Sequence, residues 1–204
     1  MKKRWKLAAA LILAVVFASA AGQFLYIQQI QQRIAGKVIR FHVVANSDSD
    51  EDQKLKLQVR DRIGVLMSDQ LKNAGSIQES RQIITDHMDE IRGYAQETVL
   101  ENGADYSVQA FLGRCRFPKK QYGTVSLPAG QYEALEVVLG EGKGHNWWCV
   151  MYPNLCFSGS MYRTDNEKDS REMKRVLDPE EYRVVMESKN YRVKFRLLTF
   201  LNDR

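Results

Sequence analysis

The stretch KVIRFHVVANSDSDEDQ, residues 37–53, decides the fold class because an extended segment gives way to a helix within it. Its first part, 37–46, is rich in β-branched and aromatic residues, which predicts a strand. Alternate side chains would point to opposite faces, Ile39, Phe41 and Val43 to one and Val38, Arg40, His42 and Val44 to the other. Residues 46–53 then supply an Asn/Ser/Asp cap and an acidic first turn, which indicate the start of a helix.

The segments that follow predict two helices and then several strands. The first helix keeps Leu55, Val59, Ile63 and Leu66 on one stripe, and a second helix over about 76–100 has similar apolar spacing. From Asp105 the apolar period changes to two, with turns at 128–130 and 140–144, which is typical of strands joined by hairpins. We therefore expect an α+β domain over 37–157, with a strand and two helices followed by an antiparallel β-meander.

The tail, residues 158–204, is more polar and reads as a short C-terminal extension packed on the domain. It contains an expected helix near 178–188. Its end, YRVKFRLLTFLN, alternates in a way that favours a last strand, although a helix is possible.

The N-terminus reads as an export signal. A basic start, MKKRWK, precedes an apolar run from Leu7 to Phe17 and an A-S-A triplet at 18–20, the pattern of a cleaved signal peptide. We expect a leader of residues 1–20, followed by a short helix or stalk at 21–36. The alternative is an uncleaved anchor reaching to about residue 27, because about 20 apolar residues span a bilayer. In either case residues 28–204 would lie outside the cytoplasm.

The charge of the chain belongs mainly to this leader. The net charge is +5, from 30 basic and 25 acidic residues, and four of the basic residues lie in the first six positions. The remainder is close to neutral, which is not the balance of a nucleic-acid-binding protein.

The cysteines favour a disulfide in an exported chain. Cys115, Cys149 and Cys156 allow one bridge and leave one thiol. Cys149 and Cys156 are near in sequence, and a Pro-Asn turn at 153–154 could bring their Cβ atoms together. We expect a Cys149–Cys156 disulfide.

The stretch GKGHNWWCVMYPNLCF, residues 142–157, contains residue types that occur in active sites. The glycines at 140, 142 and 144 flank Lys143, but a phosphate loop needs Ser or Thr after the lysine and a helix next, and here Gly144 and a strand follow. His145 and Cys149 are four residues apart on one expected strand, too far to form a nucleophile pair. We expect no catalytic residues.

Two groups of residues in the sequence resemble metal sites. His145, Cys149, Cys156 and Cys115 are zinc-ligand types, but the C-x₆-C spacing is loose and export favours oxidation. The acidic residues Asp48, Asp50 and Asp52 lack the glycine and glutamate of a calcium loop and are interpreted as a helix cap. We expect no metal and no cofactor.

Two long segments, IRFHVVANSDSDEDQKLKLQVRD (39–61) and LPAGQYEALEVVLGEGKGHNWWCVMYPNLCF (127–157), resemble the stage II sporulation protein R family of endospore-forming bacteria. RCRFPKKQYG (114–123) fits the same pattern, so the resemblance covers roughly residues 37–157. It implies a secreted signal that is exported across the forespore membrane. That signal would activate a membrane-embedded aspartic protease of the mother cell, which processes the early mother-cell pro-sigma factor.

We expect the strand-loop-helix stretch and the Trp-Trp-Cys corner to contact the receptor, because the polar residues Asn46, Ser47 and Asp48 lie beside an expected strand. Trp147 and Trp148 should point to opposite faces of a strand, which would leave one in the core and one as a partner anchor. The full set of candidate partner-binding residues is His42, Asn46, Ser47, Asp48, His145, Trp147 and Trp148. The alternative functions are an exported hydrolase and a membrane-anchored structural protein of the cell envelope.

Overall fold

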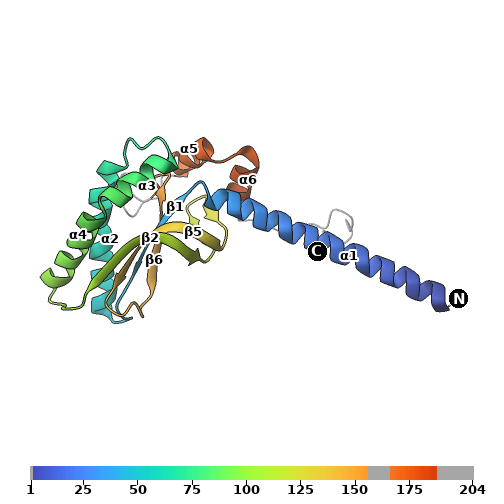
Figure 1. Ribbon diagram of the computed structural model, residues 1–204, viewed down its shortest axis with the longest axis horizontal. Coiled ribbons are helices and arrows are strands. Elements are labelled where there is room, and N and C mark those ends of the chain that lie inside the picture. Colours follow the sequence, from blue (N-terminus) through green and yellow to red (C-terminus); the bar gives the residue numbers. More distant parts are fainter. Residues whose placement is uncertain (1, 156–165, 188–204) are drawn as a thin grey trace.

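The computed structural model describes residues 2–155 and 166–187 and shows a mixed α+β domain with one long helix projecting from it (Figure 1). The elements are α1 (Lys2–Ala35), β1 (Ile39–Val44), α2 (Asp50–Gln70), α3 (Ile77–Asp86), α4 (Met88–Glu101), β2 (Val108–Phe117), β3 (Lys120–Tyr122), β4 (Val125–Leu127), β5 (Gly130–Leu139), β6 (Asn146–Tyr152), α5 (Asn166–Val176) and α6 (Pro179–Glu187). The predicted α+β class is confirmed.

Strand β1 lies inside the sheet. The strand order is β2-β5-β1-β6, with β1 parallel to β5 and antiparallel to β6, and β2 antiparallel to β5. The predicted antiparallel meander is therefore wrong, because the consecutive strands β5 and β6 are separated by β1. All six residues of β1 are buried, as is usual for a strand with neighbours on both edges and layers on both faces. Strands β3 and β4 form a separate two-stranded sheet.

One face of the sheet packs against α2, α3 and α4, which lie together on that side in Figure 1. Ile39, Phe41 and Val43 of β1 point into this layer, so the predicted alternation is confirmed. The helices contribute a row of buried apolar residues: Leu55, Val59, Ile63, Met67, Ile84, Ile91, Ala95 and Val99. This layer is the larger of the two apolar cores.

The second face packs against the end of α1, the β3–β4 pair, α5 and α6. Val38, Ala134 and Val150 from the sheet region contact a core whose other members include Ile30, Ile34, Leu127, Met173 and Val185. Helix α6 confirms the predicted helix near 178–188. Residues of this helix are buried, so this part of the extension packs on the domain. The last strand expected at 191–202 lies outside the described residues.

The helix starts follow the capping pattern in the sequence. Ser49 caps α2, since its hydroxyl accepts a hydrogen bond from the Asp52 N–H at 3.1 Å, and the first turn carries three acidic residues. The single helix expected over 76–100 is instead two helices. His87 ends α3 and precedes α4 with φ −96° and ψ 9°, a non-helical conformation.

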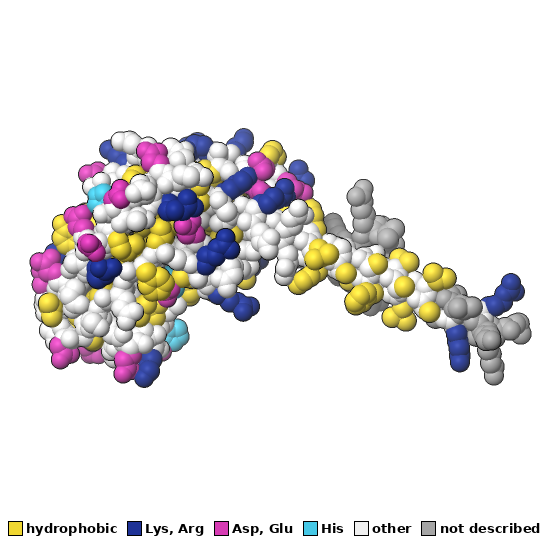
Figure 2. Space-filling model, in the orientation of Figure 1, with side chains coloured by type: hydrophobic (Ala, Val, Ile, Leu, Met, Phe, Trp, Pro, Cys, Tyr) yellow, Lys and Arg dark blue, Asp and Glu magenta, His cyan; other side chains and the backbone are white. Residues whose placement is uncertain are grey.

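Helix α1 has two parts with different surroundings. Figure 2 shows its apolar side chains exposed over the projecting part, whereas Ile30 and Ile34 are buried against the domain. Arg33 and Lys37 form ion pairs with α6, to Glu180 and to Glu181 respectively. The stretch Arg4–Ala35 is long and apolar enough to cross a membrane, a test that a signal sequence also passes. The last turns of α1 are thus part of the folded domain.

Candidate functional site

The loop after β1 and the loop before β6 meet at one end of the sheet. The Gly144 N–H donates to the Ala45 carbonyl at 2.9 Å, and the Lys143 N–H donates to the Asn46 carbonyl at 3.1 Å. The Asn46 amide oxygen accepts from the Glu141 N–H at 3.0 Å. The two segments that carry the family resemblance are therefore joined here by backbone hydrogen bonds.

Two glycines allow this close approach. A Cβ on Gly144 would lie 2.1 Å from the Ser47 carbonyl oxygen, which is closer than any real contact. Gly140 has φ +56°, and a Cβ there would lie 2.2 Å from the Asn46 amide oxygen. The glycines that resemble a phosphate loop thus serve to bring two loops together.

Asp52 holds the first loop in place from the start of α2. Its carboxylate accepts hydrogen bonds from Asn46 at 2.8 Å, from the Ser47 hydroxyl at 2.6 Å and from the Tyr106 hydroxyl at 2.8 Å. Partial burial acts to raise the pKa of Asp52, but the hydrogen bonds from Ser47, Tyr106 and Asn46 outweigh it and hold the pKa below its usual value. Asn46 and Ser47 are therefore used largely within the fold.

Four ionisable side chains in the exposed part of this end form what we call the corner surface: Asp48, Glu141, Lys143 and His145. Asp48 accepts from the His145 N–H at 2.6 Å, and its Oδ1 lies 2.5 Å from the His145 Nδ1. The hydrogen bonds from His145 lower the pKa of Asp48. The imidazole is 82% exposed, so Asp48 and His145 form a polar contact that a partner can reach.

The two tryptophans lie on opposite faces of β6, as predicted. Trp147 packs edge-on against Phe41 at 5.6 Å on the helical side, with Arg60 over its ring. Trp148 stacks on His42 at 4.8 Å on the other side. Both indoles are half-buried and have contacts within the chain, so the role of either one as a partner anchor stays a prediction.

His42 is buried, with 3% of its surface exposed, and it cannot contact a partner directly from this position. It lies beside Glu136, whose Oε2 is 3.4 Å from the imidazole Nε2. Burial lowers the pKa of His42, so the ring is neutral at neutral pH.

Cys115 belongs to the same buried group. Its thiol donates to Glu136 Oε2 at 3.0 Å, and burial, followed by this hydrogen bond, raises the pKa of Cys115 to about 12. The protonated thiol faces a carboxylate and not the imidazole, so this arrangement does not activate a thiolate nucleophile.

The other cysteines lie elsewhere. Cys149 is paired in register with Phe41 and so lies on the helical side of the sheet, opposite to Cys115. These two cysteines cannot share a metal ion, which removes the four-ligand zinc set considered from the sequence. Cys156 lies outside the described residues, and the Cys149–Cys156 disulfide stays a prediction.

Comparison with known proteins places the chain in a family. The family model described as stage II sporulation protein R matches residues 35–162. The chain is also 38% identical over 151 residues to the stage II sporulation protein R of Bacillus subtilis (strain 168). This alignment covers 71% of this chain and 67% of that protein. The chain belongs to the stage II sporulation protein R family. No solved structure matches it.

The part that matches the family model contains the whole corner surface. In this member of the stage II sporulation protein R family the match begins at the last residue of α1, so the apolar stretch of that helix precedes it. The joined loops and the buried group around Glu136 all lie between residues 35 and 162.

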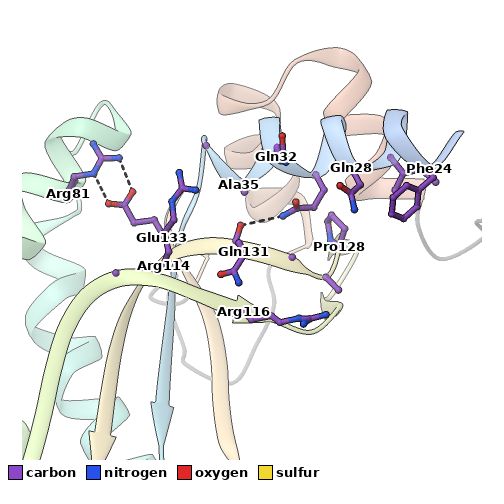
Figure 3. Close-up of a pocket in the computed structure, with 16 residues that line it drawn as sticks. Phe24, Gln28, Gln32, Ala35, Arg81, Arg114, Arg116, Pro128, Gln131 and Glu133 are labelled. Carbon is purple, nitrogen blue, oxygen red and sulfur yellow. Dashed lines mark hydrogen bonds and ion pairs between the residues drawn. The ribbon is translucent and has the colours of Figure 1, made fainter. Parts of the chain in front are cut away.

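A groove lies where α1 meets the sheet, and the sequence did not predict it. It encloses about 1060 Å³ between the last turns of α1, the start of β5 and the end of β2. Figure 3 shows Arg81 paired with Glu133 at one end, with Arg114 and Arg116 along the β2 side and Phe24 on α1. The groove needs residues 24–35 of α1, which cleavage after residue 20 would retain.

Proposed function

We propose that this chain is an exported signalling protein of sporulation that activates a membrane-embedded aspartic protease of the mother cell. The protease then processes the early mother-cell pro-sigma factor. The observation that carries the proposal is membership of the stage II sporulation protein R family, combined with an apolar N-terminal helix of the kind that directs export. The activity assigned to the chain is binding, and the chemistry belongs to the protease.

Export across the forespore membrane follows from the same helix in this proposal. Ile30 and Ile34 are buried in the domain, so cleavage after residue 20 would leave the domain core intact. A membrane-anchored protein would instead keep all of α1. The mass of the mature N-terminus separates these two cases.

The corner surface is the proposed receptor contact. Strand β1 follows α1 almost directly and carries the chain away from it over six residues, about 20 Å of extended strand. The corner surface therefore lies at the far end of the sheet from α1 (Figure 1). The corner surface is therefore clear of α1 and accessible to a partner whether or not that helix is cleaved (Figure 1).

Co-expression in a heterologous host tests the proposal. The host would carry the candidate protease, its pro-sigma substrate and this chain, and processing of the substrate would be followed by immunoblotting. We expect processing only when the chain is present and exported. The absence of processing with the exported full-length chain would overturn the proposal, and activity of the purified chain on peptidoglycan or peptides would instead support an exported hydrolase.

Variants then test the contact surface. Replacing Asp48 and His145 by alanine together should reduce processing on the order of 10-fold or more, as for residues central to an interface. The matched control is Asp89→Ala with Arg92→Ala, an exposed ion pair on α4. Equal activity of the corner variant and the wild-type chain, at equal exported amounts, would remove the corner surface from the contact.

The predicted disulfide has a separate test. Non-reducing peptide mass mapping of the exported chain should recover Cys149 and Cys156 in one linked fragment. Two free thiols at these positions would remove the bridge.

A further inference from the structure

We propose that His42, Cys115 and Glu136 form a binding site for one zinc-class divalent cation. The three residues come from the adjacent strands β1, β2 and β5. One ligand atom from each, an imidazole nitrogen, the thiol sulfur and a carboxylate oxygen, lies within 4.8 Å of the others. This inference stands independently of the protease-activating function.

The spacing of the ligand atoms fits a tetrahedral ion. The Cys115 Sγ lies 3.0 Å and the His42 Nε2 lies 3.4 Å from the Glu136 Oε2. With bonds of about 2.0–2.3 Å, tetrahedral zinc holds its ligand atoms about 3.3–3.8 Å apart. Small side-chain rotations are therefore enough to bring the three atoms around one ion.

The buried imidazole of His42 has no hydrogen-bond partner in the part of the chain that the structure describes, which indicates a bound ligand. Only 3% of His42 is exposed, and among the described residues neither ring nitrogen makes a hydrogen bond of acceptable geometry. Burying a polar group without a partner costs free energy. A cation bound through Nε2 would satisfy the nitrogen that already faces Glu136.

The aromatic neighbours of His42 fix the orientation of its ring. Trp148 stacks on it with 4.8 Å between centroids and 7° between planes, and Phe117 packs against it at 5.2 Å. A metal ligand held in one orientation by its surroundings loses little entropy on binding. The ring therefore presents Nε2 to the site in the absence of the ion.

The ligand set selects the class of metal and leaves a position open. On binding, the ion displaces the proton of the Cys115 thiol into solvent, and the resulting thiolate, with an imidazole and a carboxylate, suits zinc. Calcium and magnesium favour sites made of oxygen atoms. The two anionic ligands balance the charge of a divalent ion, which matters because the guanidinium of Arg40 is buried nearby. Glu136 is 20% exposed and Cys115 is partly exposed, so a water molecule or a partner side chain can reach the fourth position.

The alternative explanations leave part of the group unexplained. A simple thiol–carboxylate hydrogen bond explains Cys115 and Glu136, but it leaves both nitrogens of His42 without a hydrogen bond to any residue in 2–155 or 166–187. A cysteine–histidine nucleophile pair requires the imidazole beside the thiol, but the carboxylate oxygen is the group that both of them face.

Metal titration of the full-length chain in detergent micelles tests the site. Chain freed of metal with a chelator would be titrated with Zn²⁺ against a chromophoric chelator, and with Co²⁺ to detect the charge-transfer absorbance of a thiolate ligand. We expect one Zn²⁺ per chain and a thiolate–Co²⁺ band. Cys115→Ser should abolish the band and weaken Zn²⁺ binding on the order of 100-fold, and Glu136→Gln should weaken it at least about 10-fold.

Glu90→Gln is the matched control for Glu136→Gln, because it makes the same substitution at an exposed position of α4 away from both proposed sites. This variant should bind Zn²⁺ as tightly as the wild-type chain. The proposal is overturned if the wild-type chain binds no Zn²⁺, if Cys115→Ser keeps the Co²⁺ band, or if Glu90→Gln loses binding. If circular dichroism shows that Cys115→Ser does not fold, Glu136→Gln decides, and unchanged affinity in that variant overturns the proposal.

Discussion

Replacing Asp52 tests whether one carboxylate holds the corner loops together. Its Oδ2 accepts from Asn46 and Ser47, and its Oδ1 accepts from Tyr106. Asp52→Ala removes all three acceptors. Asp52→Asn has nearly the same shape and can keep all three contacts, because its amide oxygen can replace Oδ2 and its amide nitrogen can donate to the Tyr106 hydroxyl.

The two substitutions should therefore differ in cost. Hydrogen bonds to a charged group contribute about 1.5–3 kcal/mol each. Asp52 is half-buried, so water replaces part of what is lost, and we expect Asp52→Ala to lower the free energy of unfolding by about 2–4 kcal/mol. Asp52→Asn loses only the charge in the first turn of α2, and about 1 kcal/mol is expected.

Urea unfolding followed by tryptophan fluorescence measures this difference. For the full chain in micelles, Asp52→Ala should lower the urea midpoint by about 1 M, with an unchanged slope, and Asp52→Asn by less than half of that. A cost below about 0.5 kcal/mol for Asp52→Ala would refute the reasoning. An equal cost for both variants would show that the charge, and not the hydrogen-bond geometry, holds the loop.

Three further predictions follow from burial, backbone geometry and charge. The pKa of Asp52 is lowered in the folded chain. Asp52 therefore contributes stability that is complete above its ordinary pKa of 3.8 and is lost as the pH falls through the lower pKa of the folded state. Acid unfolding of Asp52→Asn should lack this loss of stability. Ile34→Ala should lower the free energy of unfolding by about 2–5 kcal/mol, because Ile34 is fully buried. Val16→Ala, on the exposed part of α1, should change the free energy of unfolding by less than about 0.5 kcal/mol. Equal effects of the two substitutions would show that α1 does not dock on the domain. Gly144→Ala should destabilise the fold by about 1–3 kcal/mol, because its Cβ would clash with the Ser47 carbonyl. Gly93→Ala, with open space in α4, should stabilise the fold by about 0.5–1 kcal/mol. Thermal unfolding of both variants measures these effects, and an unchanged stability of Gly144→Ala would contradict the loop contact.

Local patterns in the sequence predicted much of the fold. The alternation in 37–46, the cap at Ser49 and the stripe through Leu55, Val59 and Ile63 all depend on neighbours within a few residues, and the structure contains each of them. Strand pairing depends on distant segments, so the insertion of β1 between β5 and β6 was missed. The burial of all six residues of β1 follows from that insertion.

The same limit applies to the candidate site. The polar stretch 46–48 and His145 were both selected from the sequence, and the structure brings Asp48 and His145 together. His42 is a partner-binding candidate from the sequence, but it lies in the interior because β1 has neighbours on both edges. Cys115 and Glu136 reach His42 only through the order of β2, β5 and β1, which no sequence spacing could reveal.

Reconstitution of the protease in lipid vesicles tests the central claim most directly. The purified, exported chain would be added to the outer side of vesicles that contain the membrane-embedded aspartic protease, together with its pro-sigma substrate on the cytoplasmic side. The proposed function predicts that the rate of pro-sequence removal rises with the concentration of added chain and reaches saturation. A rate that is the same with and without the chain would contradict it.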